Sequence, residues 1–371
     1  MMSARFLTVV LERAFNMRDG FGREIDYMRI SVIDSCNLNC YYCNPCDNNE
    51  HCHALNILSV KEVLCIVRAA TRLGIKHFRL TGGEPLLHPQ LDEMVLQIKK
   101  ISGVSSVSLT TNAVLLAQHA KWLKEAGIDS INVSLDTIDA SEYERITKKP
   151  LLEEVKHGIN AAIECGIRVK INVVLTPQTD VVALTRYVAK KGTDIRFIEM
   201  MPVGEGHTNG VEPYKKVIGT LSKLYGEPCR INTEKTKEIN SGNDKRKIPD
   251  NGPAEYYIFP ELGIRVGLIQ AIHGKFCDTC NRIRVTADGR LMPCLGSSVT
   301  MDLVPESWDF ADDAEKDFSI VRALRAAIKA KPRCHNFNDN AVTYTKTTET
   351  KTTEIEAAEV NAARNMSRIG G

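Results

Sequence analysis

Three closely spaced cysteines near the N-terminus, Cys36, Cys40 and Cys43, are the first residues whose spacing suggests chemistry. They lie in 35-SCNLNCYYCNP-45 as C-x3-C-x2-C, in a chain with 12 cysteines in all. Three thiolates on a four-iron cluster leave one iron without a protein ligand, so a small molecule can chelate there, whereas four would make a closed electron carrier. The spacing therefore predicts an iron-sulfur cluster with one open iron.

Two alternatives to this ligand set stay open on sequence alone. A structural zinc site closes with four ligands, and the adjoining stretch 43-CNPCDNNEHCH-53 offers Cys46, His51 and His53 as a fourth. Cys46 also creates a competing C-x2-C-x2-C register. Disulfides are disfavoured because cysteine frameworks of that kind belong to small secreted domains.

A second set of three cysteines lies in the C-terminal third, in 277-CDTCNRIRVTADGRLMPC-294. Cys277, Cys280 and Cys294 have the spacing C-x2-C-x13-C, again three thiolates and not four. This pattern predicts a second cluster. The alternative is a zinc ribbon whose fourth ligand is His273, Cys229 or Cys334.

The residues between these cysteines predict a β-hairpin. Asp288-Gly289 is a strong two-residue turn signal, and pairing about it sets Cys294 opposite Ile283, so that all three sulfurs reach one cluster. Arg282 and Arg284 are two residues apart and share one face of the strand. Guanidinium groups offer planar, bidentate donors to phosphate, so the pair indicates an anionic ligand beside the cluster.

The elements that must position these residues alternate regularly between strand and helix. Strand-like runs occur at 27–33, 77–80, 105–109, 130–135, 168–174 and 194–200, and helical patterns at 60–73, 91–101, 116–126, 153–165, 180–190 and 213–224. Six βα units predict a parallel α/β fold, an incomplete triosephosphate-isomerase-like barrel. We expect the barrel in residues 1–255, the second-cluster region in 256–340 and a flexible linker and tail in 341–371.

Polar and glycine-rich stretches fall where these strands end. The first cysteine loop follows the first strand, and 81-TGGEP-85, 110-TTN-112, 134-SLD-136 and 200-MMPVGEG-206 follow later ones. Because the carboxyl ends of barrel strands meet at one face, we expect the active site there. The strands themselves carry Arg29, Arg79, Lys170 and Arg196, which with Arg282 and Arg284 can surround a triphosphate.

Composition narrows the class of protein. The chain is 43% hydrophobic and 25% charged, as a soluble globular protein is, and its net charge of +2 argues against a nucleic-acid partner. The N-terminus has no run long enough for a membrane span. We expect a cytoplasmic protein.

C-x3-C-x2-C with Tyr42 before the last cysteine, followed by GGEP, resembles the radical S-adenosylmethionine superfamily. The resemblance implies that the open iron chelates the amino and carboxylate groups of S-adenosyl-L-methionine. Electron transfer then cleaves the sulfonium to a 5′-deoxyadenosyl radical. In such enzymes the cofactor carries the reactive chemistry, and the protein positions it.

Within that superfamily the chain resembles the GTP 3′,8-cyclase family of molybdenum cofactor biosynthesis. The likeness rests on RISVIDSCNLNCYYC, RLTGGEPLL, TTNAVLL, INVSLD, IRFIEMMPVGEG, CDTCNRIRVTADGRLMPCL and the terminal SRIGG. It implies a lyase with two 4Fe-4S clusters that converts GTP to (8S)-3′,8-cyclo-7,8-dihydroguanosine 5′-triphosphate, the first step of the pathway.

The same resemblance assigns residues. It implies Tyr42, Gly83, Ser134 and Met201 at S-adenosylmethionine. At GTP it implies Arg29, Arg79, Thr110, Lys170, Arg282, Ile283 and Arg284. Catalytic roles fall to Arg282, Arg284, Gly370 and Gly371, of which the two glycines can enter the active site because they carry no side chain.

The implied partners are GTP, an electron donor such as flavodoxin or ferredoxin, and the next pathway enzyme, cyclic pyranopterin monophosphate synthase. No nucleic acid or membrane is expected, and both monomer and homodimer stay open. The chain departs from the family pattern at His77, Ala113 and His88, where lysine, glycine and arginine are usual. Two other classes stay open: a peptide-modifying radical maturase with an auxiliary cluster, and a catalytically silent, metal-stabilised binding paralogue.

Overall fold

The computed structural model describes residues 17–43, 56–203, 210–231, 252–297, 299–303, 313–335 and 337. Several residues singled out above lie outside this part of the chain: Cys46, His51, His53, the end of the 200–206 loop, and the tail with Gly370 and Gly371. Within the described part, no helix is both long and apolar enough to span a bilayer.

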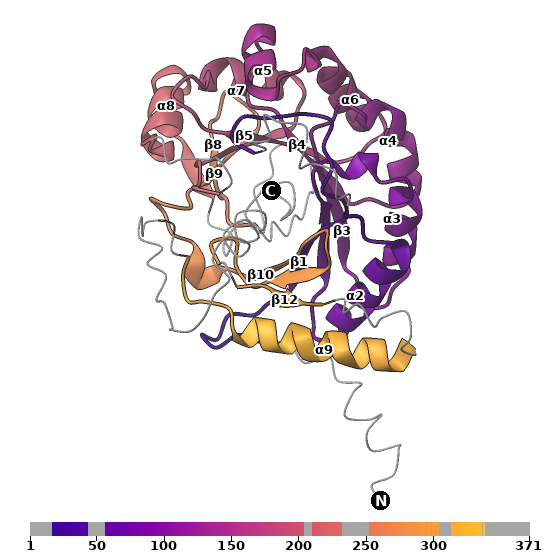
Figure 1. Cartoon of the computed structure of the whole chain (residues 1–371). Helices are drawn as coiled ribbons and strands as arrows, with labels where there is room; N and C mark the ends of the chain where they lie inside the picture. The colour runs from indigo at the N-terminus through magenta and orange to yellow at the C-terminus, as the bar shows by residue number, and fades with distance from the viewer. Residues whose placement is uncertain are drawn as a thin grey trace, which may run out of the picture.

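One curved sheet forms the centre of the molecule (Figure 1). Its strands are β1 (Tyr27–Ser31), β2 (His77–Thr81), β3 (Ser106–Thr111), β4 (Ser130–Ser134), β5 (Val169–Val174), β6 (Asp194–Ile198), β7 (Cys229–Ile231), β8 (Glu255–Ile258), β9 (Arg265–Ile269), β10 (Arg282–Val285), β11 (Arg290–Met292) and β12 (Met301–Asp302). The order across the sheet is β12-β11-β10-β1-β2-β3-β4-β5-β6-β9-β8-β7. All six strands predicted from the sequence are present.

Helices cover the outer side of the sheet (Figure 1). They are α2 (Val60–Arg72), α3 (Leu91–Lys99), α4 (Leu116–Glu125), α5 (Ala140–Thr147), α6 (Leu152–Glu164), α7 (Val181–Lys190), α8 (Gly219–Tyr225) and α9 (Asp313–Lys329), with a π-helical turn at Tyr214–Ile218 leading into α8. The predicted helices are all present. The sequence analysis missed α5, and also α9, which packs against α2.

The C-terminal region adds two further parallel strands to the sheet: β10, which was predicted as part of the hairpin but not as a neighbour of β1, and β9, which was not predicted. β10 pairs with β1, so that Tyr27 lies beside Arg282 and Arg29 beside Arg284. At the other side, β9 pairs with β6. The two flanking strands extend the six predicted ones, and β10 carries the second cysteine set to the same sheet as the first.

Strand alternation decides which side chains face the inside of the curve. On β2, Phe78 and Leu80 are fully buried in the core, while His77, Arg79 and Thr81 line the central cavity. Successive strand residues point to opposite faces, so apolar residues pack beneath the helices and polar residues gather inside.

The predicted hairpin is present, but its predicted register is wrong by one residue. Arg284 pairs with Met292 and Val285 with Leu291, which places Cys294 opposite Arg282 rather than Ile283. The loop has three residues and not two, because the Thr286 N–H donates to the Arg290 carbonyl at 2.8 Å and Gly289 adopts a left-handed φ of 76°. A glycine in this conformation is typical of three-residue hairpin loops.

Contact between α4 and α6 requires a glycine at position 158. A Cβ added there would lie 2.4 Å from the Ala113 carbonyl oxygen and 3.0 Å from the Leu116 Cβ. We expect Gly158→Ala to lower the free energy of unfolding by about 1–3 kcal/mol through overpacking. Gly219→Ala, in a helix position with open space around it, is the matched control and should raise stability by about 1 kcal/mol. Urea denaturation measures both; equal effects would contradict the prediction.

Candidate active site

A single cavity of about 660 Å³ inside the curved sheet brings the two cysteine sets together. Its lining includes Cys36, Cys40, Cys43, Cys277, Cys280 and Cys294. All six have free thiols. Two motifs separated by more than two hundred residues therefore face one space.

The GGEP loop fixes the chain that leads into the first cysteine set. The Gly83 N–H donates to the Ile33 carbonyl at 2.8 Å, and the Glu84 N–H donates to the Ser35 carbonyl at 2.7 Å. A Cβ on Gly83 would lie 2.1 Å from the Ser35 oxygen. No side chain fits between the two backbones, so glycine is required for this close approach.

Glu84, in the same loop, joins β2 to the end of β3. Its buried carboxylate accepts from the Thr111 hydroxyl at 2.7 Å, the Asn112 N–H at 2.7 Å and the Leu86 N–H at 3.0 Å. Burial raises the pKa of Glu84 to about 7 in spite of these donors. Asn112 in turn donates to Asn37 at 2.7 Å, so this network reaches the first cysteine loop.

The residues assigned to S-adenosylmethionine do not all lie at the first cysteine set: Gly83 contacts the chain just before Cys36, whereas Met201 packs with Met292 and Leu295, on either side of Cys294. The Tyr42 hydroxyl donates to Asp136, whose other oxygen accepts from the Val174 N–H at 2.7 Å. Burial raises the pKa of Asp136 to about 6. The sequence-assigned set Tyr42, Gly83, Ser134 and Met201 lines the cavity.

The two cysteine sets differ in how readily their thiols lose a proton. Burial raises the pKa of Cys36 to about 11, with a further contribution from Glu84, and raises that of Cys43 to about 12. Burial also acts to raise the pKa of Cys280, but the positive charges of Arg282 and Lys331 outweigh the effect of burial and lower the pKa of this thiol to about 7. Among the described residues, no three Cys, His, Asp or Glu side chains converge on a point as a single-ion site requires. Soft thiolate donors fit an iron-sulfur cluster.

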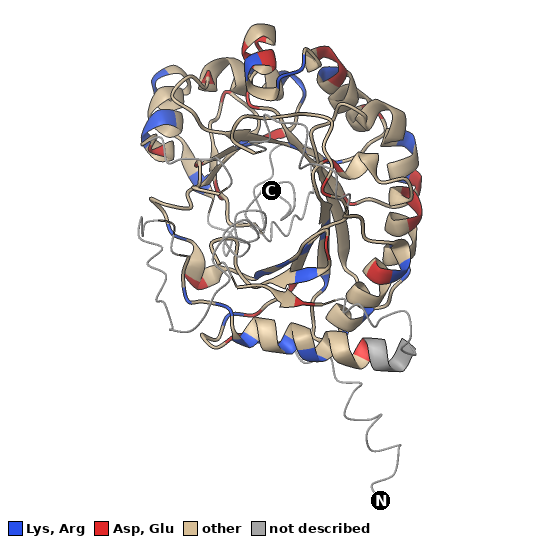
Figure 2. Ribbon diagram, viewed as in Figure 1, with Lys and Arg blue, Asp and Glu red and all other residues tan. Residues whose placement is uncertain are grey.

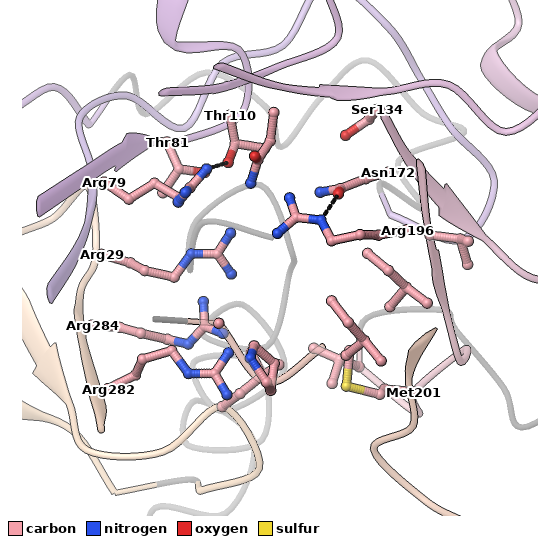
Figure 3. A pocket seen from close by; sticks show the side chains of 18 of the residues that line it. Arg29, Arg79, Thr81, Thr110, Ser134, Asn172, Arg196, Met201, Arg282 and Arg284 are labelled. Atoms are coloured by element: carbon pink, nitrogen blue, oxygen red, sulfur yellow. Dashed lines mark hydrogen bonds between the residues drawn. The ribbon is translucent and has the colours of Figure 1, made fainter. Parts of the chain in front are cut away.

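Cationic side chains line the same cavity, and Figure 3 shows Arg29, Arg79, Arg196, Arg282 and Arg284 reaching into it. The six predicted ones, Arg29, Arg79, Lys170, Arg196, Arg282 and Arg284, all line it. Arg196 donates through Nε to Asn172 at 2.9 Å, and Arg79 donates to Tyr27 and to Thr110. On the outer helices, by contrast, Lys and Arg alternate with Asp and Glu (Figure 2).

These cations repel one another. Burial, then Arg284, holds the pKa of Arg29 well below its usual range, and burial with Arg282 lowers the pKa of Arg284 to about 10. A polyanionic ligand would relieve both the desolvation and the repulsion. The cavity therefore favours a ligand with several negative charges.

Not every residue singled out in the sequence faces the cavity. Ile283 is fully buried on the opposite face of β10 and is absent from the cavity lining. His77 lines the cavity and its Nδ1 lies 2.8 Å from the Ser106 hydroxyl, whereas His88 is buried and bonds the Leu58 carbonyl. Ala113 has a left-handed φ of 66°, a conformation that favours glycine.

Lys331 and His335 are among the cavity residues that were not predicted from the sequence; both are buried and both lie in the segment after α9. His335 bonds the Ala271 carbonyl at 2.8 Å and stacks on Phe337 with ring centroids 4.3 Å apart. No local sequence pattern marks this segment as part of the site, because the backbone carbonyls that bond Lys331 and His335 lie at least 38 residues away along the chain.

The first strand of this α/β sheet leads into a three-cysteine loop, and the GGEP loop after the second strand bonds to the residues before that loop. This arrangement defines a radical S-adenosylmethionine protein. The model of the radical SAM superfamily matches residues 30–183, and that of Molybdenum Cofactor Synthesis C matches residues 193–337. The chain belongs to the GTP 3′,8-cyclase family within that superfamily.

Similar proteins cover most of the chain. The GTP 3′,8-cyclase of Clostridium perfringens (strain SM101 / Type A) is 35% identical over 324 residues, which is 86% of this chain and 95% of that protein. That of Peptoclostridium acidaminophilum is 37% identical over 328 residues, 86% and 94% of the two chains. Among solved structures, Streptococcus suis SuiB bound to precursor peptide SuiA has a TM-score of 0.52 at 15% identity, over 81% of this chain and 67% of that one. This last likeness supports the fold alone.

The buried carboxyl of Glu84 makes stability depend on pH. Its folded pKa of about 7 lies above the ordinary value of 4.5, so its stabilising contribution is complete below pH 4.5 and is lost as the pH rises through 7. The loss is on the order of 3 kcal/mol. We expect Glu84→Gln to flatten the fall in unfolding free energy of the metal-free chain between pH 5 and 8, measured by urea denaturation. Glu93→Gln, at an exposed position of α3, is the control, and an unchanged slope in Glu84→Gln would refute the prediction.

Proposed function

We propose that this chain is a radical S-adenosylmethionine enzyme that converts GTP to (8S)-3′,8-cyclo-7,8-dihydroguanosine 5′-triphosphate, the first step of molybdenum cofactor biosynthesis. One observation carries the proposal: two sets of three cysteine thiols and six Arg and Lys side chains line a single cavity. Family membership supports it, since the similar proteins bear the name GTP 3′,8-cyclase.

In this proposal the sheet is the incomplete (βα)6 barrel, and Cys36, Cys40 and Cys43 hold the first 4Fe-4S cluster. Cys277, Cys280 and Cys294 hold the second. The free thiols and their place in the cavity lining support both sites. The division into residues 1–255, 256–340 and 341–371 remains a prediction.

The chain's own residues bind and orient the two small molecules. Tyr42, Gly83, Ser134 and Met201 hold S-adenosylmethionine beside the first cysteine set. GTP lies against Arg29, Arg79, Thr110, Lys170, Arg196, Arg282, Ile283 and Arg284, with its triphosphate on the cations. Of these, Ile283 reaches the ligand only through its backbone, since its side chain lies in the core.

The reactive chemistry belongs to the bound cofactors. When bound at Cys36, Cys40 and Cys43, the first cluster would supply the electron that cleaves S-adenosylmethionine, and the 5′-deoxyadenosyl group would take a hydrogen atom from the ribose C3′ of GTP. Carbon C3′ would then bond to C8 of the guanine, and a second electron, from the electron donor, with a proton would complete the 7,8-dihydro product. Arg282 and Arg284 hold the nucleotide between the two clusters, and the cavity walls keep water from the radical. The sheet thereby fixes the distance between the hydrogen donor and its acceptor.

The remaining partners are also proposed. An electron donor such as flavodoxin or ferredoxin reduces the first cluster, and cyclic pyranopterin monophosphate synthase consumes the product. We place the enzyme in the cytoplasm, where cysteines remain reduced.

The substrate test is turnover with GTP, ATP and GMP after anaerobic reconstitution, with products identified by mass spectrometry. We expect GTP to be cyclised at least tenfold faster than GMP, because buried cations left without phosphate partners penalise the shorter nucleotide by more than about 1.4 kcal/mol. ATP should give no cyclised product. Equal turnover of ATP and GTP would refute the cyclase assignment.

Cysteine variants provide the controls for this assay. Cys36→Ala should abolish formation of 5′-deoxyadenosine, since the first cluster loses a ligand. Cys46→Ala removes a neighbouring thiol that the assignment leaves out, and it should retain cleavage. The reverse result would show that the cysteine register is wrong.

The terminal glycines, outside the described residues, are proposed to enter the active site and help position GTP. Deleting Gly370 and Gly371, or replacing Gly370 by Val, should leave S-adenosylmethionine cleavage intact and remove the cyclised nucleotide, because a side chain does not pass the narrow opening. A synthetic SRIGG peptide should restore part of the activity. Wild-type product formation by the truncated chain would exclude this role.

A further inference from the structure

Lys331 is a buried lysine that the proposed reaction does not use. Its side chain lines the cavity and is only 2% exposed. Its Nζ donates to the Arg282 carbonyl at 2.7 Å and to the Pro293 carbonyl at 2.8 Å. Arg282 lies two residues after Cys280, and Pro293 lies immediately before Cys294. One ammonium group therefore ties together the two chain segments that carry these cysteines.

Arg23 makes the matching contact to the third cysteine. Its Nη1 donates to the Cys277 carbonyl at 2.7 Å and to the Arg333 carbonyl at 2.8 Å, and its Nη2 donates to the Pro332 carbonyl at 2.6 Å. Asp19 pairs with the same guanidinium and keeps it in place. Arg23 thus connects the Cys277 segment to residues 332 and 333, directly after Lys331.

The two cations differ in where their charge is balanced. Asp19 neutralises Arg23 by a buried ion pair. Lys331 donates to two neutral carbonyls and also to the Cys280 sulfur, and the groups of opposite charge that act on it are Cys280 and Cys294. A buried ammonium without a carboxylate partner is costly unless something anionic lies close by. Thiolates bound to a cluster would supply that negative charge.

We propose that Lys331 is a positioning residue for the second iron-sulfur cluster. Its ammonium group holds the Cys280 and Cys294 segments in place, and its positive charge raises the reduction potential of the cluster. A nearby cation stabilises the reduced, more negative cluster relative to the oxidised one, and groups around the ligands tune both potential and retention. The inference rests on the second cluster of the proposed function. It assigns Lys331 no contact with the nucleotide.

The test uses the full chain with Cys36, Cys40 and Cys43 replaced by Ala, so that only the second cluster assembles. In this parent, Lys331→Met removes the charge and its hydrogen bonds at nearly the same volume. Lys331→Arg keeps the charge. Lys329→Met, at an exposed position two residues earlier, is the matched control. A redox titration followed by electron paramagnetic resonance gives the potential, and iron loss to a chelator gives retention.

We expect Lys331→Met to lower the reduction potential and to lose iron about tenfold faster than Lys329→Met, as for other residues that support metal ligands. Lys331→Arg should keep a potential near that of the parent. If Lys331→Met binds no iron, Lys331→Gln, which keeps a donor but no charge, should bind the cluster at a lowered potential. Loss of iron from both neutral variants but not from Lys331→Arg also supports the proposal, since charge is what separates them.

Two results would overturn it. Equal potentials in a neutral Lys331 variant and Lys329→Met would remove the inference while leaving the second cluster in place. A Lys331→Met enzyme, with all six cysteines present, that loses GTP affinity at an unchanged potential would assign Lys331 to the substrate instead. If the parent chain binds zinc, or no metal, at Cys277, Cys280 and Cys294, the proposed function itself is refuted. This outcome is distinct from failure of the Lys331 inference, because it is seen before any lysine is changed.

Discussion

The close backbone contact between the GGEP loop and the residues before Cys36 is the constraint on which the active site depends. Gly83 donates to Ile33, and Glu84 donates to Ser35, which extends the parallel pairing of β1 and β2 beyond the strands. Because no Cβ fits at Gly83, any side chain at this position would push the loop away from Ser35 and break these bonds. The direction in which the chain enters the first cysteine set is therefore decided by backbone geometry, and the side chains follow.

Electrostatics impose a second constraint. Helices and core side chains surround the strands, so a cation on a strand's inner face is removed from bulk water and depends on the cavity for its counter-charge. The lowered pKa of Arg29 and Arg284 reports this cost. A polyanionic ligand would recover this cost on binding, and a ligand with fewer negative charges would recover less. The same buried charges would then contribute to both affinity and specificity.

Sequence patterns predicted the parts of the molecule that are encoded locally. Strand patterns placed Arg79 and Lys170 on barrel strands, and cysteine spacing identified both sets of thiols. The hairpin register failed because a two-residue turn and a three-residue loop share the same Asp-Gly signal, and only the contact between Thr286 and Arg290 separates them. The contacts of Lys331 and Arg23 were invisible, since Arg23 and the Cys277 carbonyl are 254 residues apart. A buried cation looks like any other Lys or Arg in a sequence.

The pairing of β10 with β1 explains how the two halves of the site are held in one frame. The inner face of β10 presents Arg282 and Arg284 to the cavity, while the Arg282 carbonyl on the same strand accepts from Lys331. Arg284 lies beside Arg29 of β1, the strand that leads into the first cysteine set. A one-residue slip between these strands would turn the arginines into the core and bring Ile283 into the cavity. The register of one strand pair therefore fixes the position of the cavity-facing cations relative to both cysteine sets at once, and complete burial of Ile283 and Val285 on the other face resists such a slip.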